Sequence, residues 1–339
     1  MPNLLEIKGL RTSFLTGDGE VQAVRGISLG IGKGESVGIV GESGSGKSVT
    51  FLSVLRLTAQ SGRILEGEIL FEGQDLVKMN SRQMRAIRGN RISMIFQDPM
   101  SSLNPLIPVG DHVAEVLWEH HKDMTKAQRD QKVAELFRMI KIPEPEKRMK
   151  SFPHEFSGGM RQRVMIAMAL ACRPSLLIAD EPTTALDVTI QDQILKLMRR
   201  LQAEIGMSIL FITHDLGVVA ELCSRVVVMY GGMIMEEAPI DDIFESPLHP
   251  YTQGLLASIP SVDQDKARRL RPIAGSPPDM IHPPKGCPFA PRCPYTRRIC
   301  LEEVPPYTYR GEGRRSMCWL LAPDAPAENN PFSGKGAAQ

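Results

Sequence analysis

The eight residues from Gly41 to Ser48 have the types and spacing of a phosphate-binding loop. They fit the pattern G-x-x-x-x-G-K-[ST] at every position. Glycines let a backbone wrap closely around an anion, and a following helix N-terminus adds partial positive charge. The Lys47 ammonium can reach the β- and γ-phosphates of a nucleotide, and the Ser48 hydroxyl can ligate Mg²⁺. The residues that we expect to contact nucleotide here are Gly41, Ser43, Gly44, Gly46, Lys47 and Ser48.

The residues around this loop predict the elements that the motif needs. Residues 36–40 are apolar and partly β-branched, as in a buried strand, and residues 49–57 read as the first turns of a helix. A Gly/Ser-rich turn that matches the pattern by chance would have no reason to lie between a buried strand and a helix. We therefore expect a nucleotide site.

Two adjacent carboxylates follow a second apolar run, 133 residues beyond Lys47. Residues 176–179 predict a strand, and Asp180 and Glu181 come at its end. A strand beside the loop would bring Asp180 to the Mg²⁺ site, while Glu181 could orient an attacking water. Two acids that cap a helix would explain either residue alone, but not the apolar run with this spacing.

Two further polar side chains follow predicted strands. Gln97 follows residues 91–96, and His214 follows residues 208–213. Ligands of open α/β sheets lie at the carboxyl ends of the strands, so both are candidates for γ-phosphate or metal contacts. A lone histidine is more often structural than catalytic, and its place at a third strand end is what supports this interpretation.

A second site suited to an anion precedes a predicted helix. Ser157, Gly158 and Gly159 offer a hydroxyl and unobstructed backbone N–H groups ahead of residues 163–172. One chain rarely needs two phosphate sites for one nucleotide. The pair makes sense if the second contacts a nucleotide that another subunit holds.

Length, composition and charge fit a globular chain with one large and one small domain. The chain has 339 residues, 42% hydrophobic, and a net charge of +1, which gives no sign of nucleic-acid binding. No run approaches the ~18 apolar residues of a membrane span. The N-terminus lacks the pattern of a signal peptide, so we expect a cytosolic protein whose cysteines are not disulfides.

Along the chain, short alternating segments at residues 4–8, 20–29 and 68–72 predict an antiparallel β region. Residues 101–172 read as a helical insertion. From residue 256 to 321 prolines and cysteines dominate and the charge balance turns basic, which predicts a separate extension. Residues 322–339 read as a disordered tail.

Residues 4–255 resemble the nucleotide-binding subunit of ATP-binding-cassette (ABC) transporters. The segment 41–48 matches the Walker A loop, Gln97 the Q-loop, and residues 176–181 Walker B with its catalytic carboxylate. The other matches are Ser157, Gly158, Gly159 and Gln162 with the signature motif, Asp187 with the D-loop, and His214 with the switch histidine. The resemblance implies an α/β fold: a P-loop NTPase core, an antiparallel β subdomain and a helical subdomain.

The resemblance also implies a mechanism. Two subunits would close head-to-tail, so that Ser157 and Gly159 of one face the γ-phosphate held by Lys47 of the other. ATP would be hydrolysed with Mg²⁺ held by Ser48, Gln97 and Asp180, and closure would drive a separate membrane permease. Phe14 takes the position of the adenine-stacking aromatic, although from the sequence alone it could equally be a core residue.

The segment 247–252 resembles the start of the C-terminal extension of oligopeptide and dipeptide importer ATPases. This implies peptide import at the cytoplasmic face of the inner membrane, with a paralogous second ATPase and a periplasmic or extracellular substrate-binding protein. Importers of nickel, glutathione or another small solute, and soluble ABC proteins, are the alternatives. A P-loop kinase or GTPase would leave the signature and His214 unexplained.

Four cysteines of the extension lie within 32 residues. Cys287, Cys293, Cys300 and Cys318 follow the spacing C-x₅-C-x₆-C-x₁₇-C. Zinc sites favour tight C-x₂₋₄-C pairs, whereas a [4Fe–4S] cluster accepts ligands from widely spaced loops. The ATPases that this extension resembles include cluster-bearing members. We therefore favour a structural [4Fe–4S] cluster over zinc, with four unligated thiols as the simplest alternative.

Overall fold

A computed structural model describes residues 3–98, 102–184, 186–259 and 272–332 of the chain. The chain divides into two units. The helical unit comprises Met1–Leu4, Ile31–Ser36 and Lys78–Ile212, and the phosphate-loop unit comprises Leu5–Gly30, Val37–Val77 and Thr213–Gln339.

A four-stranded sheet in the phosphate-loop unit confirms the predicted antiparallel region, with longer strands than expected. Its order is β2-β1-β4-β5, and β4 pairs antiparallel with both β1 and β5. The strands are β1 (Leu5–Thr16), β2 (Gly19–Ile31), β4 (Gly62–Phe71) and β5 (Gln74–Asp75). Alternate residues of β1, such as Leu5 and Ile7, are buried, which fixes the face that packs inward.

A second group of strands leads into the phosphate loop. β3 (Ser36–Val40) is buried at every residue and pairs in parallel with β9 (Arg225–Tyr230). β9 turns back into β10 (Met233–Pro239) through the Gly-Gly pair between them. Because β3 is covered on both faces, its residues after Ser36 are apolar or glycine rather than alternating.

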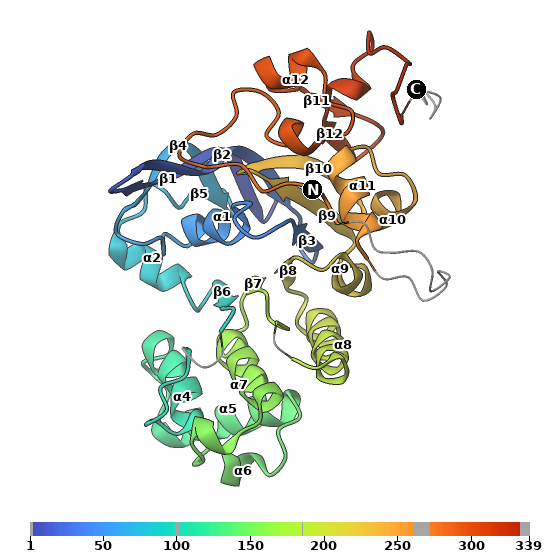
Figure 1. Cartoon of the computed structure of the whole chain (residues 1–339). Helices are drawn as coiled ribbons and strands as arrows, with labels where there is room; N and C mark the ends of the chain where they lie inside the picture. The colour runs from blue at the N-terminus through green and yellow to red at the C-terminus, as the bar shows by residue number, and fades with distance from the viewer. Residues whose placement is uncertain (1–2, 99–101, 185, 260–271, 333–339) are drawn as a thin grey trace. The chain divides into compact units, whose positions relative to one another are not determined.

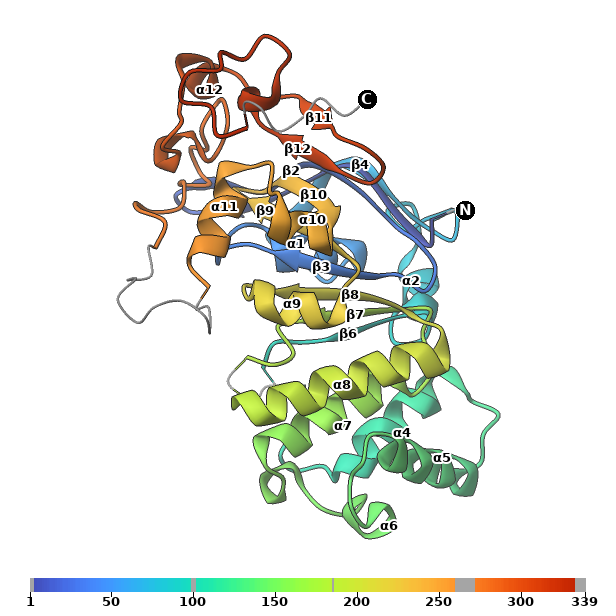
Figure 2. The ribbon, with the colours of Figure 1, turned by 90° about the vertical axis from the view of Figure 1, so that its right-hand side faces the viewer.

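The extension continues this sheet. β12 (Arg315–Met317) pairs with β10, and β11 (Tyr307–Tyr309) pairs with β12, so that the hairpin lies beside β10 in both views (Figures 1 and 2). The helices of the phosphate-loop unit are α1 (Lys47–Val54), α9 (Leu216–Leu222), α10 (Ile240–Glu245), α11 (Pro250–Ala257) and α12 (Arg298–Glu302), with the 3₁₀ turns η2 (Ala290–Arg292) and η3 (Trp319–Leu321). The extension therefore belongs to the same unit as the loop, and the unit crosses the predicted boundary at residue 255.

The predicted disorder of the tail needs correction for residues 322–332. Phe332 is buried against a small core made of Leu248, Cys318, Leu320 and Leu321. The Asn330 side chain donates a hydrogen bond from Nδ2 to the Leu320 carbonyl at 2.8 Å. The buried Phe332 ring and the Asn330 hydrogen bond hold residues 322–332 in place. Residues 333–339 lie outside the described ranges.

The helical unit places helices against three parallel strands. The strands β6 (Ile92–Ile95), β7 (Leu176–Asp180) and β8 (Ser208–Thr213) pair in that order. The helices are α2 (Ser81–Ile87), α4 (Val109–His120), α5 (Lys126–Met139), α6 (Pro145–Arg148), α7 (Gly158–Leu170) and α8 (Val188–Ile205), with the 3₁₀ turn η1 (Pro153–Glu155). α4, α5 and α7 pack on one another (Figure 2). Nowhere in the described ranges does a helix reach the length and hydropathy of a bilayer span.

A buried carboxylate joins the sheet to α11. Glu236 lies in β10 with no exposed surface, and its two oxygens accept the backbone N–H groups of Leu248 and His249 at 2.6 and 3.0 Å. Burial raises the pKa of Glu236 to about 7, against the opposing effect of these hydrogen bonds. The protonated form is therefore more favourable in the folded than in the unfolded chain.

We predict that the free energy of unfolding falls as the pH rises from about 4.5 to about 7, because the folded-state pKa of Glu236 lies above its unfolded value. Glu236→Gln cannot ionise, so the stability lost by this variant relative to wild type should be largest near pH 5 and smaller near pH 8. Urea unfolding of both proteins at the two pH values measures this. A stability difference that is the same at both values would contradict the raised pKa.

Candidate functional site: the phosphate loop and the strand-end carboxylate

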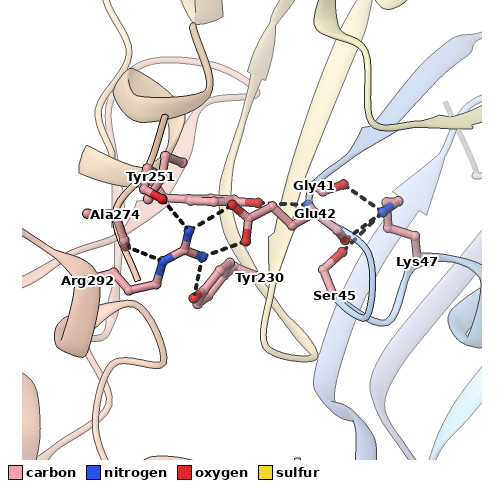
Figure 3. Close-up of polar contacts among 9 residues, drawn as sticks. Gly41, Glu42, Ser45, Lys47, Tyr230, Tyr251, Ala274 and Arg292 are labelled. Atoms are coloured by element: carbon pink, nitrogen blue, oxygen red, sulfur yellow. Dashed lines mark hydrogen bonds and ion pairs between the residues drawn. The ribbon is translucent and has the colours of Figure 1, made fainter. Parts of the chain in front are cut away.

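The phosphate loop closes around its own lysine. Lys47 begins α1 and is only 6% exposed. Its ammonium donates to the carbonyl oxygens of Gly41 at 2.7 Å and Glu42 at 2.9 Å, and contacts Ser45 Oγ at 3.4 Å (Figure 3). Ser43 and Gly44 are exposed at the crest of the loop. The loop is thus shaped, and carries the positive charge, to receive phosphate.

Glycine is required at two positions of the loop because neighbouring backbone lies very close. Gly46 has φ +94°, and a Cβ there would lie 2.4 Å from the Ala23 carbonyl oxygen. Gly41 has φ +153°, and a Cβ there would lie 2.1 Å from the Met229 carbonyl oxygen. Gly44 also has positive φ, +77°, but no atom would lie within 4 Å of its Cβ. Conformation alone therefore favours glycine at 44, and packing adds to it at 41 and 46.

The predicted catalytic carboxylate forms a cluster at the ends of β6 and β7. Asp180 is buried at the end of β7, and Glu181 follows with φ +47°, a left-handed conformation that is unfavourable for a side chain. Gln97 Nε2 and Thr184 Oγ1 both donate to Glu181 Oε2, at 3.0 and 2.9 Å. The structure thus brings together Gln97 and Glu181, and it adds Thr184, which the sequence analysis did not single out.

The remaining predicted phosphate and metal contacts fall in different units. Gln97, Asp180 and Glu181 lie in the helical unit, whereas Lys47, Ser48 and His214 lie in the phosphate-loop unit. His214 is exposed directly after β8. A shared γ-phosphate and Mg²⁺ for these residues stay a prediction.

The residues of the predicted second anion site lie at the N-terminus of α7. Ser157 caps the helix, and its Oγ accepts the Met160 N–H at 3.4 Å, while Ser157 and Gly158 are exposed. A Cβ at Gly159 would lie 2.6 Å from Ile190 Cγ2, so glycine lets α7 approach α8 closely. Gln162 is only 1% exposed and so lies away from the exposed end of the helix.

Two other predicted nucleotide-site residues have structural roles as well. Asp187 is exposed and caps α8, where its Oδ1 accepts the Ile190 N–H at 3.0 Å. Phe14 is half-buried in β1 opposite Gly62 of β4, and a Cβ at Gly62 would lie 2.7 Å from its ring. The Phe14 ring therefore covers a strand glycine, and adenine stacking by this residue stays a prediction.

Comparison with known proteins identifies the family. The ABC transporter family matches residues 24–184, and the oligopeptide/dipeptide transporter C-terminal region matches residues 235–300. The oligopeptide transport ATP-binding protein OppD of Bacillus subtilis is 54% identical over 98% of this chain and 93% of that protein. The chain belongs to the ABC transporter ATP-binding proteins. The dipeptide transport ATP-binding protein DppD of the same organism is 50% identical over 98% of the chain and 99% of its own length.

Solved structures agree with this assignment. The dimeric ATP-binding cassette MJ0796, in a post-hydrolysis state with ADP and Pi, has a TM-score of 0.63 and 28% identity and covers 70% of this chain and 98% of its own. The predicted ABC nucleotide-binding fold is confirmed, and ATP hydrolysis is the general activity of the family. ATP with Mg²⁺ fits the phosphate loop of this ABC ATPase.

The cysteines of the extension line one cavity. All six cysteines of the chain lie in the described ranges as free thiols. Cys287, Cys293, Cys300 and Cys318 line a pocket together with aromatic residues such as Phe289 and Trp319. Burial, with a smaller effect of the neighbouring thiols, raises the pKa of Cys287 to about 12. Within the described residues no three His, Cys, Asp or Glu side chains are arranged to hold a metal ion, so neither the predicted cluster nor the zinc alternative has a formed metal site there.

The phosphate loop also has partners that the sequence analysis missed. Glu42 donates its backbone N–H to Tyr251 Oη at 2.8 Å, and its carboxylate pairs with Arg292 of the extension (Figure 3). Glu42 occupies a variable position of the loop motif, and Arg292 lies 250 residues away. In the sequence, Arg292 is marked only by its position directly before Cys293, and this position does not predict that it pairs with Glu42.

We predict that Gly46→Ala is far more damaging than Gly44→Ala, although both glycines have positive φ. The Gly44 variant should lose about 1 kcal/mol of unfolding free energy, from backbone strain alone. The Gly46 variant must in addition displace the Ala23 strand, so it should lose at least twice as much and bind ATP poorly. Urea unfolding and titration with a fluorescent ATP analogue measure both effects. Equal losses would show that the Ala23 contact imposes no constraint.

Proposed function

We propose that this ABC ATPase energises the import of di- or oligopeptides through a separate membrane permease. The observation that carries the proposal is the combination of the oligopeptide/dipeptide transporter region at residues 235–300 with relatives named for oligopeptide and dipeptide transport. The protein acts peripherally, at the cytoplasmic face of the inner membrane. Import of nickel, glutathione or another small solute is the alternative.

In the proposed mechanism, ATP closes a pair of ATPase subunits. Ser157 and Gly159, at the N-terminus of α7, face the γ-phosphate bound by Lys47 of the second subunit. Glu181 orients the attacking water. Gln97 donates a hydrogen bond to the Glu181 carboxylate and holds that carboxylate in place. The dimeric form of the similar cassette MJ0796 supports pairing of this kind. The second subunit is a paralogue, and a substrate-binding protein delivers the peptide.

The choice of solute can be tested in membranes. The permease that copurifies with this chain, reconstituted in liposomes with its substrate-binding protein, should show ATPase activity stimulated by di- or oligopeptides. Stimulation by nickel or glutathione and not by peptides would overturn the peptide assignment, and full transport with this chain as the sole ATPase would overturn the heterodimer.

We predict that Glu181→Gln binds Mg·ATP with nearly wild-type affinity but hydrolyses it about 10²–10⁴-fold more slowly, because a positioned general base contributes that much. The variant should also accumulate as an ATP-bound dimer. Phosphate release and gel filtration with ATP measure the two effects. Glu135→Gln, an exposed glutamate of α5, is the matched control and should hydrolyse ATP normally. Wild-type turnover by Glu181→Gln would mean that another group is the base.

The cysteine cavity carries a finer proposal, a structural [4Fe–4S] cluster with zinc as the alternative. Its support is that all four cysteines line one cavity, in which buried thiolates would need a cation. A cluster would bring the four thiols together and so stabilise the extension.

We predict that anaerobically purified protein contains about four iron atoms per chain and absorbs broadly near ~400 nm. Cys300→Ser should lose the iron and the absorption, whereas Cys172→Ser, outside the cavity, should keep both. If metal analysis finds one zinc and no iron, the site holds zinc and not a cluster. If it finds neither metal, the four cysteines are unligated structural thiols.

A further inference from the structure

An arginine of the extension makes a two-pronged ion pair with the phosphate loop. Arg292 Nη1 lies 2.5 Å from Glu42 Oε2, and Arg292 Nη2 lies 3.1 Å from Glu42 Oε1. The Arg292 side chain is 6% exposed and that of Glu42 is 26% exposed, so water screens the pair only in part. Parallel N–H···O bonds of this type fix geometry as well as charge.

The remaining donors of the Arg292 guanidinium are also used. Nε donates to the Ala274 carbonyl at 2.9 Å, Nη2 to the Ile273 carbonyl at 2.9 Å, and Nη1 to Tyr230 Oη at 3.0 Å (Figure 3). The hydrogen bond to Glu42 is the main reason that the pKa of Arg292 is raised. Together these bonds use the planar fork of the guanidinium from three nitrogens, which the single ammonium of a lysine cannot reproduce.

The other groups of Glu42 are held as firmly as its carboxylate. Its N–H donates to Tyr251 Oη of α11 at 2.8 Å, and its carbonyl oxygen accepts from the Lys47 ammonium at 2.9 Å. Tyr230, Tyr251 and Phe289 pack ring against ring, with centroids 4.6 to 5.4 Å apart. The peptide that orients Lys47 is therefore fixed by α11 and by η2 of the extension.

We propose that Arg292 is a positioning residue for nucleotide binding: with Tyr251 it holds Glu42 so that the loop is preshaped for phosphate, and it couples the extension to nucleotide affinity. When this clamp is broken, the loop samples other shapes, and the apparent affinity falls with the fraction that remains competent. The clamp touches no phosphate itself. The proposal rests on ATP binding by this family and not on peptide import, so it stands whichever solute is moved.

The test is a double-mutant cycle on the full-length chain, with a fluorescent ATP analogue as the probe. Arg292→Gln and Glu42→Gln should each weaken binding about tenfold, a typical size for coupling between sites. The double variant should be no weaker than either single variant, because both remove the same interaction. Additive losses would mean that the two residues act separately, and no loss would mean that the loop holds its shape unaided; either result overturns the proposal.

Two further variants separate positioning from general damage to the extension. Arg314→Gln removes an arginine, 14% exposed, that anchors the extension through Asp242 and Ser246 rather than through the loop, and should leave affinity within about twofold of wild type. Tyr251→Phe keeps the ring packing and loses only the acceptor for the Glu42 N–H, and it should raise the KM for ATP while kcat changes little. This variant still decides the question if Arg292→Gln fails to fold. An equal loss in Arg314→Gln, or an unchanged KM in Tyr251→Phe, would contradict the clamp.

Discussion

The buried ammonium of Lys47 imposes the constraint on which the phosphate loop depends. A charge removed from water must find oxygen partners, and the Gly41 and Glu42 carbonyls supply them. Those carbonyls can turn inward only if the loop bends sharply, and at Gly41 and Gly46 it does so with neighbouring backbone within 2.1 and 2.4 Å of a hypothetical Cβ. A phosphate that binds the loop would take over part of the Lys47 coordination.

In the helical unit, the predicted catalytic carboxylate Glu181 lies on a strained stretch of backbone. Glu181 has φ +47°, a conformation that costs about 1–2 kcal/mol for a residue with a side chain. Its backbone N–H is held by the Ile212 carbonyl at 2.9 Å, while Gln97 and Thr184 hold the carboxylate. Buried strand pairing on both sides of β7 maintains the turn. The strain thus directs the carboxylate away from the strand, next to but distinct from the buried Asp180.

Local pattern was enough to predict the buried strands, the phosphate loop and the strand ends that carry Gln97 and Glu181, because a strand end and the residue after it are encoded within a few positions. The hydrogen bond between Gln97 and Glu181 was not predicted. The Glu42–Arg292 pair was not predicted, since its partners are 250 residues apart, Glu42 occupies a variable position of the loop motif, and Arg292 belongs to no motif. It overestimated disorder after residue 322 because a single aromatic, Phe332, decides whether a polar tail packs. The spacing of the four cysteines in the sequence favoured a cluster, but spacing along the chain does not determine the distances between their thiols.

Arg292 lies between residues that line the cysteine cavity, so the clamp connects that cavity to the phosphate loop. Phe289 and Cys293 flank Arg292 and line the cysteine cavity, while Arg292 itself contacts the loop. A 3₁₀ turn of three residues, Ala290–Arg292, is too short to absorb a displacement between these two contacts. Coupling free energies are reciprocal, so an extension that preshapes the loop for nucleotide must itself be stabilised when nucleotide binds, by the same factor. Nucleotide should therefore protect the cysteine cavity from opening, through the contact of Arg292 with Glu42.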